Sequence, residues 1–225
     1  MKGRRRYMGS EEPFDGFLVR GKFTDDSGPE DWCLCFSADR NQKTNIAEFV
    51  NPITKEFIYT EEEPRANMPR FLCGYNTVIE KIYRISGVEN PTNLYGLFIQ
   101  ALSIIYIDIR DINTSNVTSF GYFVQSNTKL KELHVNWDLS SATTMGASFD
   151  NCFNLTTILG TIKNLKVSLS LKSSPLTNES AMVFINGLAE VETPQTITFS
   201  AATYATLTPE QIAIAERKNW IVAKV

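Results

Sequence analysis

Histidine and cysteine are both scarce in this sequence of 225 residues. There is one histidine, His134, and there are four cysteines. A single histidine disfavours metal sites and catalytic triads that depend on imidazole. Cys33 and Cys35 form a C-x-C pair, but the second pair or nearby histidine that a zinc site needs is missing. We therefore expect the cysteines to be reduced and buried as small apolar side chains, and we expect no metal and no cofactor.

Long apolar segments and a large charge excess are also missing. The most apolar segment, residues 95–107, contains Gln100 and Ser103 and is shorter than the about 20 residues that cross a bilayer. The basic cluster at Arg4–Arg6 is followed by polar residues instead of the apolar core of a signal peptide. The 22 basic and 25 acidic residues give a net charge of −3. We expect no signal peptide, no membrane insertion and no nucleic-acid partner.

The motifs of common enzyme classes do not occur. The sequence has no nucleophile elbow, no Walker-type loop and no glycine-rich dinucleotide motif. A glycan-acting enzyme would need a pair of carboxylates, for which Asp108 and Asp138 are candidates. Solvated acidic residues are the commoner arrangement on a protein surface, and His134 falls at an ordinary outward strand position. We therefore expect a protein that is not an enzyme and has no catalytic residues.

What the sequence does contain is a repeat from Met68 onward. Phenylalanine recurs at spacings of 27, 25 and 26 residues, and an aliphatic pair recurs at steps of 25, 26 and 25 residues. Because several positions share one period, stacking the repeats would align equivalent side chains in a continuous core. The phenylalanines are Phe71, Phe98, Phe123 and Phe149, and the aliphatic pairs are Ile79/Ile82, Ile104/Ile107, Leu130/Leu133 and Leu155/Ile158.

This period is typical of leucine-rich repeats. The fold class that it predicts is α+β: a leucine-rich-repeat solenoid of short strands with helical or irregular returns, preceded by a small β-rich module. We place the module at residues 1–65 and the solenoid at residues 66–225. Longer, polar turns from about residue 166 are expected to cap the solenoid.

Local patterns predict the elements around the repeat. Before residue 66, alternating apolar and polar residues separated by turn signals predict a hairpin or small sheet, followed by a second hairpin. Toward the C-terminal end, a helix is expected at residues 178–189, and another is expected to begin after Thr208 with a capping box to Gln211. The expected strands lie at residues 17–23 and 31–36 in the first hairpin, 49–52 and 56–60 in the second, 107–109 and 133–135 in the repeat, and 167–171, 196–199 and 220–222 after it.

One segment resembles a known repeat family. Residues 107–123 read IDIRDINTSNVTSFGYF, and residues 137–155 form a similar repeat. The pattern, most specifically its Asn-Thr-Ser-Asn-Val-Thr segment, is similar to that of the BspA-like leucine-rich-repeat surface proteins found in gut bacteria and their phages. The resemblance covers residues 68–225. It implies a repeat fold and the function of an adhesin or another binding protein, not of an enzyme.

The repeat and the resemblance together imply a binding protein. The expected function is a non-enzymatic phage virion component of fibre, spike or decoration type, assembled in the host cytoplasm. Residues 1–65 would bind other virion proteins and form a homo-oligomer such as a trimer, while the repeat would present a face to a host surface protein or glycan. The alternatives are a bacterial surface adhesin, an intracellular scaffold and, behind these, a glycan-acting enzyme. The candidate face consists of outward strand residues and their neighbours: Tyr83, Arg84, Asp108, Arg110, His134, Asn136, Ser168 and Thr198.

Overall fold

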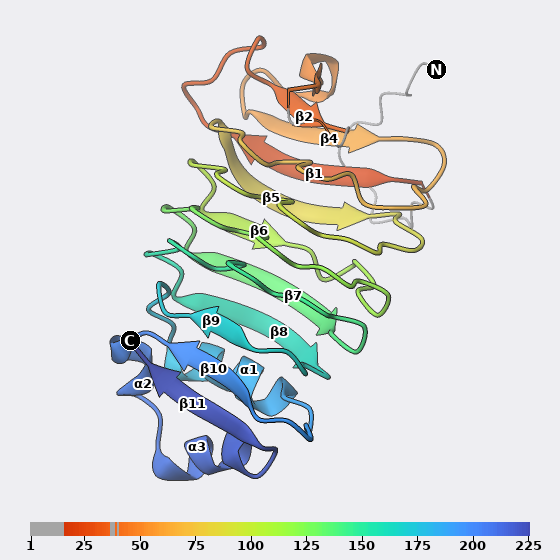
Figure 1. The fold of residues 1–225 in the computed structure, drawn as a ribbon. Helices are drawn as coiled ribbons and strands as arrows, with labels where there is room; N and C mark the ends of the chain where they lie inside the picture. The colour runs from red at the N-terminus through yellow and green to blue at the C-terminus, as the bar shows by residue number, and fades with distance from the viewer. Residues whose placement is uncertain (1–15, 37–38, 40) are drawn as a thin grey trace.

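The computed structural model describes residues 16–36, 39 and 41–225, so the basic cluster at Arg4–Arg6 lies outside the described residues. Figure 1 shows the strands stacked along the molecule, with the α-helices gathered at its C-terminal end. The strands are β1 (Leu18–Phe23), β2 (Cys33–Cys35), β3 (Lys43–Asn45), β4 (Glu56–Thr60), β5 (Ile79–Ser86), β6 (Tyr106–Asp108), β7 (Glu132–Asp138), β8 (Thr157–Lys163), β9 (Leu169–Leu171), β10 (Gln195–Phe199) and β11 (Trp220–Lys224). The helices are the 3-10 helix η1 (Ala47–Phe49) and the α-helices α1 (Asn178–Gly187), α2 (Ala201–Tyr204) and α3 (Pro209–Glu216).

The fold is a mixed α/β fold, and the predicted α+β leucine-rich-repeat solenoid is wrong. Its main sheet has six strands in the order β4-β1-β5-β6-β7-β8. In this sheet β1 runs antiparallel to β4 and β5, whereas β5, β6, β7 and β8 run parallel. Within the described chain, α-helices occur only after residue 177. A sequence period aligns equivalent positions, but it does not determine which strands join the sheet at its ends, and here the N-terminal strands complete it.

The alignment of equivalent aliphatic residues is nevertheless confirmed. Ile82 pairs in register with Ile107, Ile107 with Leu133, and Leu133 with Ile158. All four side chains are fully buried. The register of the parallel strands therefore follows the period of the sequence, and a slip of one residue would expose this apolar row.

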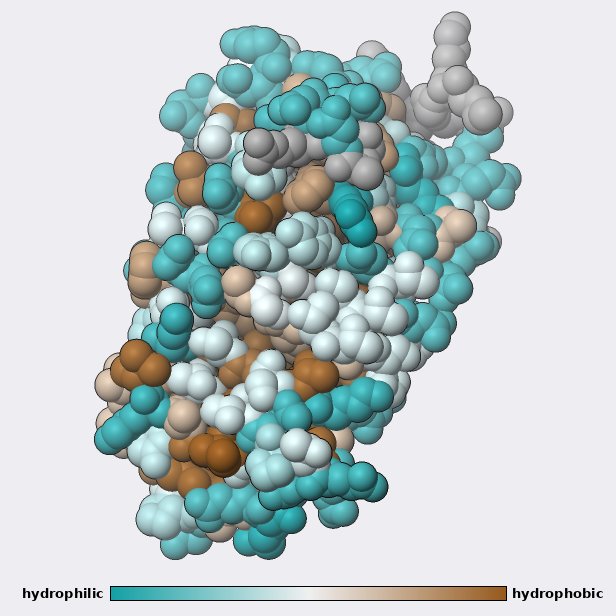
Figure 2. Space-filling model, viewed as in Figure 1, coloured by the Kyte–Doolittle hydropathy of each residue, from teal (hydrophilic) through white to brown (hydrophobic). Residues whose placement is uncertain are grey.

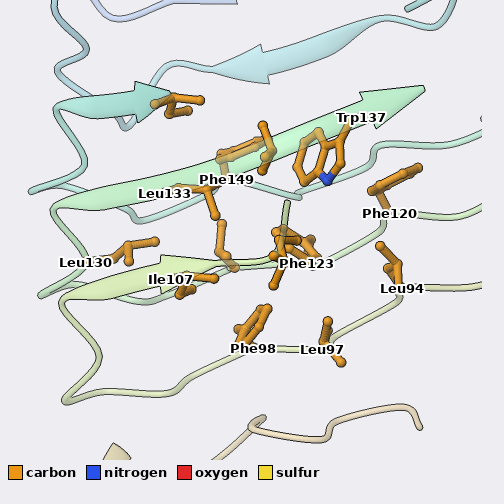
Figure 3. Packing of buried hydrophobic residues seen from close by; sticks show 14 of the residues in the cluster. Leu94, Leu97, Phe98, Ile107, Phe120, Phe123, Leu130, Leu133, Trp137 and Phe149 are labelled. Carbon is orange, nitrogen blue, oxygen red and sulfur yellow. The ribbon is translucent and has the colours of Figure 1, made fainter. Parts of the chain in front are cut away.

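Aromatic side chains fill the space between the parallel strands and the returning chain (Figure 3). Phe98 and Phe123 lie edge to face with their ring centres 5.4 Å apart, and Trp137 of β7 lies 6.3 Å from Phe149. Burying a side chain of this size contributes about 1.5–3 kcal/mol. Phe71 departs from the series: it is half-buried, and its backbone is left-handed, with φ at 59°.

The N-terminal strands pair differently from the prediction. β1 and β2 do not pair with each other in the predicted hairpin or small sheet, since β1 pairs with β4 and β5 while β2 pairs with β3. The strands approach closely at Gly21, where a Cβ atom would lie 2.4 Å from the Lys81 carbonyl oxygen and 2.6 Å from the Phe57 ring. The second hairpin is confirmed in part: Val50 bridges Phe57 in the antiparallel direction, but only β4 forms a strand there.

The elements predicted after the repeat are confirmed with small shifts in their bounds. β9, β10 and β11 form a parallel three-stranded sheet at the three predicted strands. α1 begins at Asn178 as predicted, but it ends at Gly187 instead of Ala189. The Gln211 N–H donates to the Thr208 hydroxyl oxygen, and the Thr208 N–H donates to the Gln211 side-chain oxygen. The predicted capping box is therefore formed at the start of α3.

The cysteines are mostly buried, as expected for cysteines that pack as small apolar side chains. Cys35, Cys73 and Cys152 are buried, and Cys33 is half-buried. Burial raises the pKa of Cys152 to about 12 and raises that of Cys73 as well. These two thiols therefore stay protonated at neutral pH and pack as small apolar side chains.

The surface in Figure 2 is mainly hydrophilic or weakly polar, and apolar side chains gather toward the C-terminal elements at its lower end. Large apolar side chains exposed in the second half of the chain include Phe153, Leu159, Ile221 and Val225. Single exposed apolar side chains of this kind are ordinary on a protein surface. None of the helices in the described chain has the length and apolar character needed to cross a bilayer.

Candidate binding face

Alternate residues of β5, β6 and β7 point away from the core. Side chains along a strand alternate between the two faces of a sheet. Because Ile107 and Leu133 are buried, Tyr106 and Asp108 of β6 and His134 of β7 lie on the opposite side. The register places Asp108 directly beside His134. We call this side of the six-stranded sheet the outward face.

A hollow of about 330 Å³ opens on the outward face. It spans β5, β6 with the turn that follows it, and β7, so three successive strands contribute to one site. Five of its six lining residues belong to the set predicted from the sequence. The lining residues are Tyr83, Arg84, Asp108, Arg110, Asp111 and Asn136.

Two arginine–carboxylate pairs line the hollow. Arg110 donates to Asp108 from Nε to Oδ1 at 3.1 Å and from Nη2 to Oδ2 at 2.6 Å, and its backbone N–H also donates to Oδ1. Arg84 Nε donates to Asp111 Oδ2 at 2.5 Å. Both carboxylates face a guanidinium group, so the four groups together carry no net charge. The bidentate pairing of Arg110 with Asp108 also fixes the plane of the Arg110 guanidinium group.

Asp108 forms the floor of the hollow, while the other three charged residues form its rim. The Asp108 side chain is 13% exposed, whereas those of Arg84, Arg110 and Asp111 are about half exposed. Burial alone would raise the pKa of the Asp108 carboxyl, but the hydrogen bonds from the Arg110 side chain and backbone outweigh it and hold the pKa below its usual value. Asp108 is therefore a fixed anion at neutral pH.

Three rings form a row beside these pairs. The Tyr83 and Tyr106 ring centres are 6.1 Å apart, and those of Tyr106 and His134 are 5.1 Å apart. Both tyrosines are half-buried, and burial raises their pKa, so their hydroxyls stay protonated at neutral pH. We call Tyr83, Tyr106 and His134 the ring row.

His134 is more enclosed than the sequence predicted. Its side chain is 12% exposed and lies between two carboxylates: Nε2 contacts Glu132 Oε1, and Nδ1 lies 4.0 Å from Asp108 Oδ2. Nδ1 is buried and makes no hydrogen bond within the described residues. The residue thus connects the ring row to the floor of the hollow.

Asp108 and Asp138, the candidate carboxylate pair of a glycosidase, are both held as anions. A hydrogen bond from Asn164, together with those from Ser140 and Lys163, lowers the pKa of Asp138 to about 2 despite partial burial. Glycoside hydrolysis needs one carboxyl with a raised pKa to protonate the leaving group. This pair supplies two bases and no general acid.

Two predicted residues lie apart from the hollow. Ser168 precedes β9, where its hydroxyl donates to Gln195 Oε1 at 2.8 Å, and Thr198 lies on β10. Thr198 therefore belongs to the three-stranded sheet, and Ser168 lies just before its strand β9. Asp111, by contrast, was missed by the sequence prediction. The signal that would have found it is its charge, which is opposite to that of Arg84, 27 residues earlier in the chain.

No family model, no curated protein and no solved structure matches the chain. The described residues also contain no group of three or more His, Cys, Asp or Glu side chains placed to hold a metal ion. The outward face must therefore be interpreted from its own geometry. That geometry is a shallow polar hollow with two internally neutralised ion pairs and an adjacent row of rings.

Proposed function

We propose that this chain is a recognition protein that binds its ligand on the outward face and catalyses no reaction. The observation that carries the proposal is the hollow itself, in which residues from three successive strands meet. Its polar groups are fixed in orientation by pairing, and its rings remain partly accessible. Such a surface is preorganised for contact, which reduces the entropy lost on binding.

We propose further that the recognition takes place on a phage particle, where the chain is a fibre, spike or decoration protein. The resemblance of residues 107–123 to the BspA-like repeat, whose family occurs in gut bacteria and their phages, supports this setting. Residues 1–65 would contact other virion proteins. β4 lies at one edge of the six-stranded sheet, and an edge strand offers backbone groups for pairing with another chain.

Cell binding tests the recognition function. The labelled full chain is incubated with a panel of gut bacteria, together with the variant Arg84→Ala/Arg110→Ala. The matched control is Lys163→Ala, which removes a more exposed cation of β8 that does not line the hollow. We expect the parent chain and the control to bind and the double variant to lose binding, while a cooperative thermal unfolding transition shows that the double variant is still folded. Binding by none of the proteins, or equal binding by all, would contradict the proposal.

Mass spectrometry of purified phage particles tests the setting. We expect peptides of this chain in the particles at a level comparable to other fibre or decoration proteins. A gene that lies among bacterial housekeeping genes, with no peptides in the particles, would instead indicate an intracellular scaffold or a bacterial adhesin.

A further inference from the structure

We propose that the ligand of the hollow is a neutral saccharide, with one or two sugar units seated against Tyr83 and their hydroxyls on the two arginine–carboxylate pairs. This inference rests on the proposed function, because it names the chemical class of ligand for the same face.

The charge balance of the hollow points to a neutral ligand. An anionic ligand would compete with Asp108 and Asp111 for the two guanidinium groups, and a cationic ligand would compete with the arginines for the two carboxylates. Beside each group that attracts it, either ligand would also meet a like charge, because each guanidinium group is already paired with a carboxylate. A neutral ligand that leaves both pairs intact meets no such cost.

A hydroxyl group suits an intact ion pair because it both donates and accepts. It can accept from an unused N–H of Arg84 or Arg110 while it donates to the neighbouring carboxylate. Both arginine side chains are about half exposed, so part of each guanidinium group remains open to a ligand. Sugars carry hydroxyls on adjacent carbons, which lets one ring engage several such positions. Asn136, which also lines the hollow, adds an amide donor and acceptor.

The rings provide the apolar part of the site. A pyranose has an apolar C–H face, and an aromatic ring packs well against such a surface. Tyr83 lines the hollow, and Tyr106 lies next to it in the ring row. Burial raises the pKa of the Tyr83 hydroxyl, so it stays protonated as an additional neutral donor.

The dimensions of the hollow fit a small polar ligand better than a folded protein. Its volume of about 330 Å³ lies at the lower end of the roughly 300–1,000 Å³ of small-molecule sites. A stable protein interface would bury about 800 Å² on each partner around apolar anchor residues. The hollow is instead lined by four charged residues, one amide and one tyrosine.

A glycan array tests the inference with the full chain. The array contains neutral oligosaccharides of glucose, galactose, mannose and N-acetylglucosamine, and acidic ones that carry sialic acid, uronic acid or sulfate. We expect binding to neutral members. Tyr83→Ala and Arg110→Ala should each weaken it about tenfold or more, since each removes a central contact. Tyr83→Phe keeps the ring and should retain most of the binding, and Lys163→Ala should leave it unchanged. Binding to acidic members only, to no member, or without loss in Tyr83→Ala and Arg110→Ala would overturn the inference.

Treatment of bound cells separates this inference from the proposed function. Mild periodate oxidation destroys sugar diols, whereas protease treatment removes surface proteins. Binding that periodate abolishes supports the saccharide. Binding that only protease abolishes leaves the recognition function in place and overturns the saccharide. If neither cells nor neutral oligosaccharides are bound, both proposals fail.

Discussion

The two sides of the six-stranded sheet differ in how closely they follow the repeat. On the inner side, one aligned row holds Ile82, Ile107, Leu133 and Ile158, all aliphatic and fully buried. One residue further along each strand, the outward row changes chemistry at every step. The repeat therefore maintains the core, while the variation between repeats creates the candidate site.

The outward row illustrates this variation. Asp108 pairs in register with His134, and His134 with Leu159, so a carboxylate, an imidazole and an aliphatic side chain succeed one another. Neighbouring side chains on one face of a sheet contact each other across strands. A row of unlike residues therefore produces a local site, whereas a row of like residues produces a uniform core. Substitutions on the two sides should accordingly affect different properties.

The largest effect is expected on the inner side, at Trp137. Its ring is 1% exposed and lies 5.1 Å from Phe120 and 5.3 Å from Phe123. Trp137→Ala should lower the free energy of unfolding by about 3–5 kcal/mol. Urea denaturation measures this change. Trp137→Phe should cost far less, because it keeps an aromatic ring and removes an indole N–H that is buried without a hydrogen-bond partner among the described residues. Equal losses for the two variants would contradict this account of the core.

The next prediction concerns an exposed position where the backbone, not the side chain, decides the outcome. Gly160 of β8 has φ at 108°, and a Cβ atom there would lie 1.9 Å from the Val135 carbonyl oxygen. Gly160→Ala should therefore cost about 1–3 kcal/mol of unfolding free energy, as expected for a strained backbone. The control is Leu159→Ala at the exposed neighbouring residue, which should change stability by only about 0.5 kcal/mol. Equal losses of stability in the two variants would contradict the prediction, because they would show that the backbone at Gly160 tolerates a Cβ atom.

The inner side and the local elements were predictable from sequence, whereas the pairing partners were not. The aliphatic period gave the register of β5 to β8, and Thr208 and Gln211 gave the start of α3, because both signals are local or periodic. The insertion of β1 between β4 and β5 depends on pairing between segments far apart in the chain. No local pattern in residues 17–23 encodes that choice.

The residues predicted for the candidate face lie together where the period holds and apart where the period changes. Tyr83, Arg84, Asp108, Arg110 and Asn136 all fall in repeats of about 25 residues, and they meet in the hollow. After the period lengthens, the chain forms a separate sheet, which contains Thr198 and is preceded directly by Ser168. The outward row of the six-stranded sheet therefore ends at β8, because β8 and β9 belong to different sheets, and Ser168 and Thr198 lie apart from the hollow.

An intermediate effect on stability is expected at Asp138, the last residue of β7. Its folded pKa of about 2 lies below the ordinary value of 3.8, because Asn164, Ser140 and Lys163 bind the ionised form. A depressed pKa stabilises the fold above pH 3.8, and this stability is lost as the pH falls through about 2. Since the side chain is 21% exposed, solvent screening reduces the contribution to about 1 kcal/mol.

The variant Asp138→Asn tests this contribution through the pH dependence of unfolding. We expect the parent chain to be more stable than the variant at pH 5 to 7, and the difference to shrink as the pH is lowered toward 2. Thermal unfolding at several pH values measures both curves. A difference that stays constant over this range would show that the carboxylate charge does not contribute and that the amide merely packs poorly.

The smallest effect on stability is expected at Arg84, on the rim of the hollow. Its pair with Asp111 is about half exposed, and exposed ion pairs contribute about 0–1 kcal/mol. Arg84→Ala should therefore leave the unfolding transition almost unchanged, although it removes one of the two guanidinium groups that a ligand would contact. Binding to cells or neutral oligosaccharides should fall about tenfold, as expected for the loss of a charge-assisted hydrogen bond. If Arg84→Ala instead destabilised the fold as much as Trp137→Ala, the outward face would be part of the stabilising core, and the division between the two sides would fail.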